Sequence, residues 1–455
     1  MALVDSDFKE TYKLMQKLVQ NKCVSPPGNE MPSIRTIESF LKNNGINSII
    51  TETAPNRGNL FAKIPGTDPT ADAMLLGPSH VDVVPISNPD EWTTDPFGGE
   101  IKNGFIYGRG VLDMLFIVAA QVIAFSKIFN DKIELKGDLM LLIVSDEESG
   151  AEYGTKHFFD NNLSLFGDLN KHKVFCITEG GGQVLYNKLL LLRTGERGVA
   201  WKRLVFKGIP GHGAFPYKKN SALEQASKAV TQLSKYIHNE MPTDFTLTKD
   251  YLEALAEFEP DIKNLLTTKN FKKDLEAFHL KNKELASTTF AITHLTFSPN
   301  VMNSGVKVNT VPGKAVLDVD VRPLPNHDKE YTELHLKNAL GDLNPEIIPL
   351  LPEDSGTYGS LSPQTPNKSN FVKLIHESVK MELPDIKVIP SIVGGGTDAR
   401  FCRNAGMDAY GFAVRNPDLS LDDFGPAHGI DEKIDLKSID LTLKCYYNLI
   451  NLFFK

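Results

Sequence analysis

Six polar side chains are of the types that bind divalent metal ions. Five stand at the ends of expected strands or helices, and the sixth, His428, lies in a loop flanked by glycine and proline. Two imidazoles and several carboxylates, without cysteine, suit zinc or a similar divalent ion. There are more carboxylates than one zinc ion needs, which makes sense if two metal ions lie roughly 3.5–4 Å apart and share one bridging carboxylate. The six residues are His80, Asp113, Glu147, Glu148, Glu179 and His428.

Two short-range pairs within this set suggest a division of roles. His80 and Asp82 are two residues apart at the end of an extended run, so both point to the same side and Asp82 can hold one ring nitrogen of His80. Glu147 and Glu148 are adjacent, so they can serve one tight site only in different roles. One can bind a metal ion while the other accepts a proton from water.

Each residue taken alone also has an ordinary structural explanation. A single loop histidine is more often a hydrogen-bonded surface residue than a ligand. Asp113 could simply cap the helix that follows it. A glutamate pair after a strand is more often solvated. Six such residues gathering by accident at the ends of core elements is much less expected, so the combination favours a shared site.

The apolar runs around these residues predict an α/β fold. We expect continuous buried strands at Ala73–Leu76, Leu139–Val144 and Val174–Thr178, of the kind found in largely parallel sheets. An almost wholly apolar helix is expected over residues 115–128. Polar residues at the strand ends place the site at one edge of the sheet.

The pattern changes after residue 194 to a β-α-(insert)-β-β-α-β order, which is typical of an open-faced, ferredoxin-like α+β module. We place this module at 195–355, with a charged helical insert at 241–288 and a following strand at Thr289–Phe297. A turn-rich linker, Pro352 to Pro366, then returns the chain to the first domain. We therefore expect one discontinuous domain from 1–194 and 356–455, with the module inserted in it.

Composition and charge exclude several classes of protein. The chain has 455 residues and a net charge of -8 without a compensating Lys/Arg run, which argues against nucleic-acid binding. No signal peptide is visible at the start, and no apolar run is expected to approach the roughly 20 residues of a membrane span. A cytoplasmic protein without membrane partners is predicted. Neither a disulfide framework nor a cysteine zinc site is expected from the four scattered cysteines, Cys23, Cys176, Cys402 and Cys445.

From about residue 10 to 455, the order of motifs resembles the co-catalytic zinc exopeptidase and deacylase family. That family includes aminoacylase-1, glutamate carboxypeptidase, yeast carboxypeptidase S, acetylornithine deacetylase and succinyl-diaminopimelate desuccinylase. The motifs are Ser79 to Pro85, Trp92 with Asp95-Pro96-Phe97, Tyr107 to Met114, Asp146-Glu147-Glu148, Glu179-Gly180-Gly181, Gly211-His212-Gly213, Asn309 to Pro312 through Arg322, Gly395 to Asp398, and His428-Gly429.

This resemblance implies a fold and a set of roles in the metal centre. The fold would be a phosphorylase/hydrolase-like mixed-sheet catalytic domain with an inserted ferredoxin-like lid and dimerisation domain. Asp113 would bridge two divalent metal ions, most commonly zinc, with cobalt or manganese possible. One ion would also be held by His80 and Glu179 and the other by Glu148 and His428, while Glu147 acts as general base and Asp82 orients His80.

The resemblance also assigns residues of the inserted domain. His212 would help to stabilise the oxyanion at the scissile carbonyl, often across a homodimer. Asn309 and Arg322 would bind the substrate, the arginine being suited to a carboxylate. A capping histidine and a surface ion pair are the ordinary explanations for His212 and Arg322. The substrate pocket would be lined by the loop that contains Gly395, Gly396 and Thr397.

The implied activity is hydrolysis of an amide bond next to a free carboxylate, in an N-acyl amino acid or a short peptide. One departure from the family pattern stands out, because Leu115-Phe116-Ile117 follows Asp113-Met114 where the family usually has a lysine and small residues. Bulky residues there could reshape the pocket or its surroundings. Two alternatives stay open: a weak or inactive binding homologue of the same fold, and a single-metal enzyme of unrelated chemistry.

Overall fold

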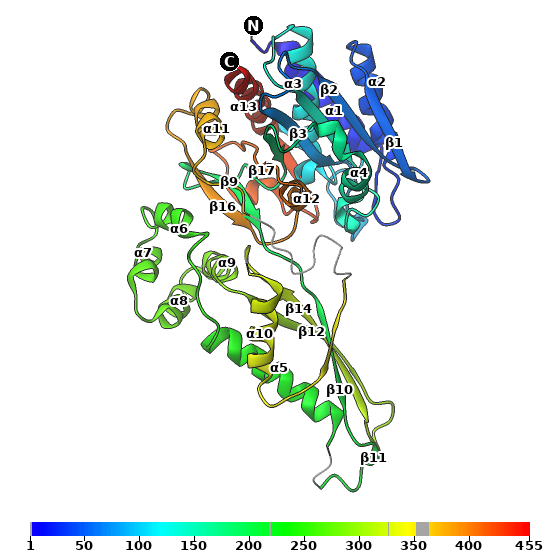
Figure 1. Cartoon of the computed structure of the whole chain (residues 1–455), viewed down its shortest axis with the longest axis vertical. Coiled ribbons are helices and arrows are strands. Elements are labelled where there is room, and N and C mark those ends of the chain that lie inside the picture. The colour runs from blue at the N-terminus through cyan, green and yellow to red at the C-terminus, as the bar shows by residue number, and fades with distance from the viewer. Residues whose placement is uncertain (1, 218–219, 326, 352–363) are drawn as a thin grey trace. The chain divides into compact units, whose positions relative to one another are not determined.

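The computed structural model describes residues 2–217, 220–325, 327–351 and 364–455 (Figure 1). The chain divides into two compact units. The first consists of Met1–Thr194, Thr365–Pro390 and Thr397–Lys455, and the second of Gly195–Gln364 and Ser391–Gly396. Most of the linker expected between Pro352 and Pro366 lies outside the described residues.

The first unit is built on a mixed sheet. Its central strands β6, β3, β7 and β17 are neighbours in that order and run parallel, while β1 and β2 add antiparallel strands at one side. The mixed α/β fold class predicted from the sequence is therefore confirmed. The strands are β1 (Ser48–Ala54), β2 (Arg57–Ile64), β3 (Ala73–His80), β6 (Leu139–Val144), β7 (Val174–Thr178), β8 (Val184–Leu185), β9 (Leu189–Glu196), β16 (Lys387–Val393) and β17 (Asp408–Gly411).

Alternation along the strands divides the core into two layers, one on each face of this sheet. In β6, Leu139, Leu141 and Ile143 belong to one apolar cluster, and Met140, Leu142 and Val144 belong to the other. Residues of helices supply the rest of each layer. The first cluster includes residues of α1 (Asp5–Gln20), α2 (Met31–Asn43), α3 (Phe116–Asn130), α11 (Asn370–Lys380) and α13 (Leu436–Phe454), and the second of α4 (Thr155–Asn162) and α12 (Ala399–Asn404).

Helix α3 is apolar on nearly every side because it lies inside the first layer. The helical stretch Val111–Asn130 is long and apolar enough to cross a membrane, with a mean hydropathy of 1.9, but 89% of the window is buried inside the structure. The expectation that no apolar run approaches this length was therefore wrong. Burial on all sides by neighbouring helices and the sheet explains the composition without a membrane.

The second unit has the β-α-β-β-α-β succession predicted from the sequence. Its antiparallel sheet has the order β12-β14-β10-β15, and an apolar cluster joins the sheet to its two helices. In chain order the elements are β10 (Lys202–Lys207), α5 (Ala222–Asn239), β12 (Thr296–Ser304), β14 (Lys314–Arg322), α10 (Lys329–Leu340) and β15 (Glu346–Pro349). A separate ribbon is formed by β11 (Gly211–His212) and β13 (Thr310–Val311).

The helical insert is longer than expected. The strand predicted at Thr289–Phe297 begins at Thr296, because residues up to Thr293 still belong to α9. The β-branched residues there favour a strand locally, but the buried positions follow a spacing of three or four residues, as in a helix packed on a core. The insert contains α6 (Lys249–Leu255), α7 (Pro260–Thr267), α8 (Phe271–His279) and α9 (Lys283–Thr293).

Candidate metal centre

Three of the expected ligands stand at the carboxyl ends of neighbouring parallel strands. His80 ends β3, Glu148 follows β6, and Glu179 follows β7 directly. Since β6, β3 and β7 are parallel neighbours, their carboxyl ends meet at one edge of the sheet. Sheet topology therefore brings together side chains that are up to about a hundred residues apart in the chain.

Asp113 reaches the same edge from a kinked turn before α3. The turn spans Val111–Leu115, and the peptide bond from Asp113 to Met114 is cis. The buried carboxylate of Glu432 accepts hydrogen bonds from the backbone N–H groups of Leu112 (2.8 Å) and Gly110 (3.2 Å). This distant residue thus fixes the backbone on which Asp113 is carried.

The same glutamate also organises the loop of His428. Glu432 pairs with Arg109 at 2.7 Å, and both side chains are almost fully buried. Arg109 in turn donates a hydrogen bond of 3.1 Å to the backbone carbonyl of His428. One buried ion pair therefore positions both Asp113 and His428.

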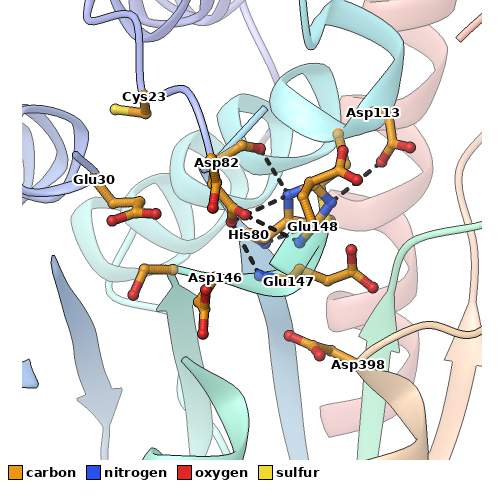
Figure 2. A network of polar contacts seen from close by, with 12 residues as sticks. Cys23, Glu30, His80, Asp82, Asp113, Asp146, Glu147, Glu148 and Asp398 are labelled. Carbon is orange, nitrogen blue, oxygen red and sulfur yellow. Dashed lines mark hydrogen bonds and ion pairs between the residues drawn. The ribbon is translucent and has the colours of Figure 1, made fainter. Parts of the chain in front are cut away.

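Asp113 lies between the two histidines. Its Oδ1 is 3.2 Å from Nε2 of His80 (Figure 2). Its Oδ2 is 3.2 Å from Nε2 of His428. The other neighbours fall into two groups. Glu179 Oε2 lies 3.5 Å from Nε2 of His80, and Glu148 Oε1 lies 3.1 Å from Nε2 of His428. This is the geometry that a bridging carboxylate between two cation positions requires.

Asp82 lies beside His80 and close to the turn of Glu147 and Glu148 (Figure 2). Nδ1 of His80 is 3.0 Å from the backbone carbonyl of Asp82 and 3.6 Å from its carboxylate. The carboxylate also accepts the backbone N–H groups of Glu147 at 3.2 Å and Glu148 at 3.0 Å. Asp82 thus orients the ring of His80 through its backbone carbonyl, and its buried carboxylate holds the turn that carries both glutamates.

The charges in this cluster are strongly coupled. Burial acts to lower the pKa of His80, but hydrogen bonds with Asp113 and Glu179 outweigh it and hold the pKa well above its ordinary value. Hydrogen bonds with Asp113 and Glu148 raise the pKa of His428 to about 10. Burial raises the pKa of Glu179 to about 7 and that of Glu147 well above its ordinary value. The cluster of carboxylates therefore favours protons on the two histidines and on the buried glutamates. Bound cations would displace these protons.

The donor set fits divalent metal ions. Ligand atoms of His80, Asp113 and Glu148 all lie within 4.8 Å of one another, and so do those of His80, Glu147 and Glu179. Imidazole and carboxylate donors at such spacing suit zinc and similar ions. Glu147 belongs to the second group, so its side chain stands where either a ligand or a general base would stand.

The remaining predicted site residues do not belong to this cluster. His212, Asn309 and Arg322 belong to the second unit. Residue 309 precedes β13, which pairs with the strand of His212, and the carbonyl of Asn309 accepts a hydrogen bond from Gly213. Arg322 ends β14 and binds Asp320 with an Nε to Oδ1 distance of 2.7 Å.

The loop predicted to bind the substrate is divided between the two units. Gly395 and Gly396 belong to the second unit, and Thr397 belongs to the first. The bulky residues after Asp113 do not line the site, because Leu115, Phe116 and Ile117 are all buried in the first core layer.

Sequence reasoning missed a buried network beneath the glutamate turn. Arg57 binds Glu30 at 2.7 Å and Asp146 at 2.8 Å, and Asp146, in a left-handed conformation, directly precedes Glu147.

Sequence reasoning also missed Arg415, which lies four residues after β17. The signal was available, because Arg415 is a charged residue that directly follows an apolar run at a strand end, as Glu179 does.

Known proteins related in sequence span most of the chain. Mouse N-fatty-acyl-amino acid synthase/hydrolase PM20D1 is 27% identical over 423 residues, which cover 88% of this chain and 77% of that protein. The probable carboxypeptidase S-like 2 of Dictyostelium discoideum is 24% identical over 404 residues, covering 85% and 72%. A succinyl-diaminopimelate desuccinylase of Xanthomonas campestris is 36% identical over 162 residues, which cover 35% of this chain and 41% of that protein.

Solved structures share the fold over the full length. The M20 family metallo-carboxypeptidase Sso-CP2 of Sulfolobus solfataricus has a TM-score of 0.68 at 20% identity, covering 98% of this chain and 99% of that one. The dipeptidase Dug1p of Saccharomyces cerevisiae has a TM-score of 0.63 at 16% identity, covering 99% and 96%. The resemblance stated from the motifs is confirmed, and the model of peptidase family M20/M25/M40 matches residues 78–452. The chain therefore belongs to peptidase family M20/M25/M40 and is an enzyme of its metallopeptidase and amidohydrolase class.

Proposed function

We propose that this enzyme binds two divalent metal ions, most commonly zinc, and hydrolyses an amide bond next to a free carboxylate. The observation that carries the proposal is the position of Asp113, with one carboxylate oxygen facing His80 and the other facing His428. His80 and Glu179 would complete the first metal site, and Glu148 and His428 the second. Bound ions supply Lewis acidity, which polarises an amide carbonyl and lowers the pKa of a water molecule.

The chain's own residues perform the proton transfers. Glu147 accepts a proton from the attacking water and returns it to the leaving nitrogen. Burial raises its pKa well above the ordinary value, which favours proton uptake by this carboxylate. Asp82 keeps the turn of Glu147 in place through its hydrogen bonds to the backbone.

The second unit would act as lid and dimerisation domain. His212 would stabilise the oxyanion, while Asn309, Arg322 and the loop of Gly395, Gly396 and Thr397 would bind the substrate. A homodimer in the cytoplasm is part of this proposal.

The relatives' names suggest which acyl groups to test. They mention N-fatty-acyl amino acids, a carboxypeptidase and a succinyl derivative. The proposal predicts chelator-sensitive release of the amine from at least one member of a panel of N-lauroyl, N-succinyl and N-acetyl amino acids and dipeptides.

The variant Glu147→Gln tests whether Glu147 acts as a general base or as a metal ligand. We expect kcat to fall by about 10²- to 10⁴-fold while two metal ions per chain remain bound, since only the proton acceptor is lost. Glu152→Gln is the matched control on the same loop, because Glu152 is exposed and pairs only with Lys156 among the described residues. Loss of one metal ion in Glu147→Gln would instead make Glu147 a ligand, and unchanged kcat would remove it from the mechanism.

A further inference from the structure

Arg415 stands at the same sheet edge as the metal centre. It follows β17, which is the parallel neighbour of β7, so the carboxyl ends of both strands lie together. The backbone N–H of Arg415 donates to the carbonyl of Gly182 at 2.9 Å. A Cβ added at Gly181 would lie 2.4 Å from the carbonyl oxygen of Gly411, so the loop that begins with Glu179 lies directly against this segment.

The guanidinium of Arg415 has no protein partner among the described residues. Its Nε is buried without a hydrogen bond, although the side chain keeps some contact with solvent. Its guanidinium carbon lies 5.2 Å from the centroid of the Phe424 ring. Two other buried arginines of this unit are paired with carboxylates, Arg57 with Glu30 and Arg109 with Glu432.

An unpaired cation in such a position is unfavourable. Burial lowers the pKa of Arg415 to about 10, and the positive charge of Arg193 acts in the same direction. The carboxylates of Asp113, Glu432 and Asp435 oppose this shift, Asp113 most strongly. When Asp113 holds metal ions its charge is shared with them, so Arg415 loses part of this compensation. Buried charges are normally paired, and one left without a partner lowers stability.

We propose that Arg415 binds the carboxylate of the substrate, next to the scissile amide. A guanidinium can bind a carboxylate through two parallel hydrogen bonds, which gives both affinity and orientation. Phe424 covers the guanidinium and limits its movement. In contrast Arg322, which the family resemblance assigns to a carboxylate, is already paired with Asp320. The inference rests on the proposed function and names a further specificity-determining residue for it.

The test compares wild type with Arg415→Gln and Arg415→Lys, using each N-acyl amino acid of the panel beside its uncharged carboxamide. Arg35→Gln is the matched control, because Arg35 is exposed and pairs with Glu38. We expect Arg415→Gln to raise KM for the acids about 30-fold, the worth of a charged hydrogen bond, with little change in kcat. The carboxamides, which lack the negative charge, should be affected only about two- to tenfold, the worth of an ordinary hydrogen bond, and lysine should restore part of the affinity for the acids.

A second measurement does not depend on turnover. The melting temperature of ligand-free Arg415→Gln should equal or exceed that of wild type, because an uncompensated charge has been removed. A saturating concentration of an N-acyl amino acid should raise the melting temperature of wild type but not of Arg415→Gln.

The outcomes distinguish this proposal from the proposed function. Equal losses on acids and carboxamides, or a ligand-free variant that melts lower, would make Arg415 a structural cation and overturn the proposal, while hydrolysis by wild type would leave the proposed function standing. If wild type hydrolyses no member of the panel, the proposed function fails. The role of Arg415 is then tested by the rise in melting temperature that the N-acyl amino acid causes. A shift that Arg415→Gln abolishes supports carboxylate binding, and no shift in wild type refutes it.

Discussion

Replacing Arg57 by methionine should lower the free energy of unfolding of the first unit substantially, although Arg57 is not one of the candidate metal ligands. Arg57 is buried with Glu30 and Asp146, whose side chains are 0% and 2% exposed, and it binds both at 2.7–2.8 Å. It also donates to Ser25 and covers the ring of Tyr153. Methionine would keep much of the volume but leave two buried carboxylates without a cation. Breaking a buried pair in this way costs about 3–5 kcal/mol of unfolding free energy.

A matched control isolates the effect of burial. Arg35→Met removes the same side chain from an exposed pair with Glu38, which should cost about 0.2–1 kcal/mol. The assay is urea unfolding in a Trp201→Phe background. Trp92 is then the only tryptophan of the chain and reports on the first unit.

The pH dependence of the stability lost in Arg57→Met checks that buried carboxylates cause the loss. Burial raises the pKa of Asp146, and the charge of Arg57 counteracts that rise. Without Arg57 the folded variant holds a proton on Asp146 more tightly than the unfolded chain does, so the stability deficit should shrink as pH falls from 7 to 5. A deficit no larger than that of Arg35→Met, or one that grows toward acid, would refute the reasoning.

Two further predictions concern the metal site and the second unit. Asp82→Ala should weaken metal binding about 10- to 100-fold in a competition titration with a chelator, because it removes the carboxylate that lies 3.6 Å from Nδ1 of His80 and accepts the backbone N–H groups of Glu147 and Glu148; exposed Asp90→Ala is the control, and equal affinities would contradict the role. Burial lowers the pKa of His294 from its ordinary 6.5 to about 4, so the unfolded chain binds the proton first and His294 costs stability as pH falls from about 6.5 to 4. Relative to His294→Gln, wild type should lose about 3 kcal/mol of unfolding free energy across that range, and parallel pH curves would exclude this cause.

Much of the metal centre was predictable from local pattern. Glu147, Glu148 and Glu179 each follow an uninterrupted apolar run, and such runs mark buried parallel strands. A strand end fixes where a side chain emerges, so the sequence alone was enough to place these residues at one sheet edge.

The parts that escaped prediction depend on distant or weak signals. The loop of His428 is held by Arg109, more than three hundred residues earlier, and no local pattern carries that information. Strand β17 has only four residues and ends in glycine, so the strand was not recognised and the apolar run that leads to Arg415 was not used. Helix α13 was omitted although its signals are present, since Asp435 caps it by accepting the N–H of Ser438.

The interrupted first unit has a consequence for how the protein is made. On the ribosome, β7 and Glu179 appear before the second unit, whereas β17 and His428 follow it. At a synthesis rate of roughly 5–20 residues per second, about ten to fifty seconds separate Glu179 from His428. During that interval β7 has one edge without its parallel neighbour β17, and such open edges invite pairing with other chains. The nascent polypeptide is therefore most in need of chaperone protection while its second unit is emerging.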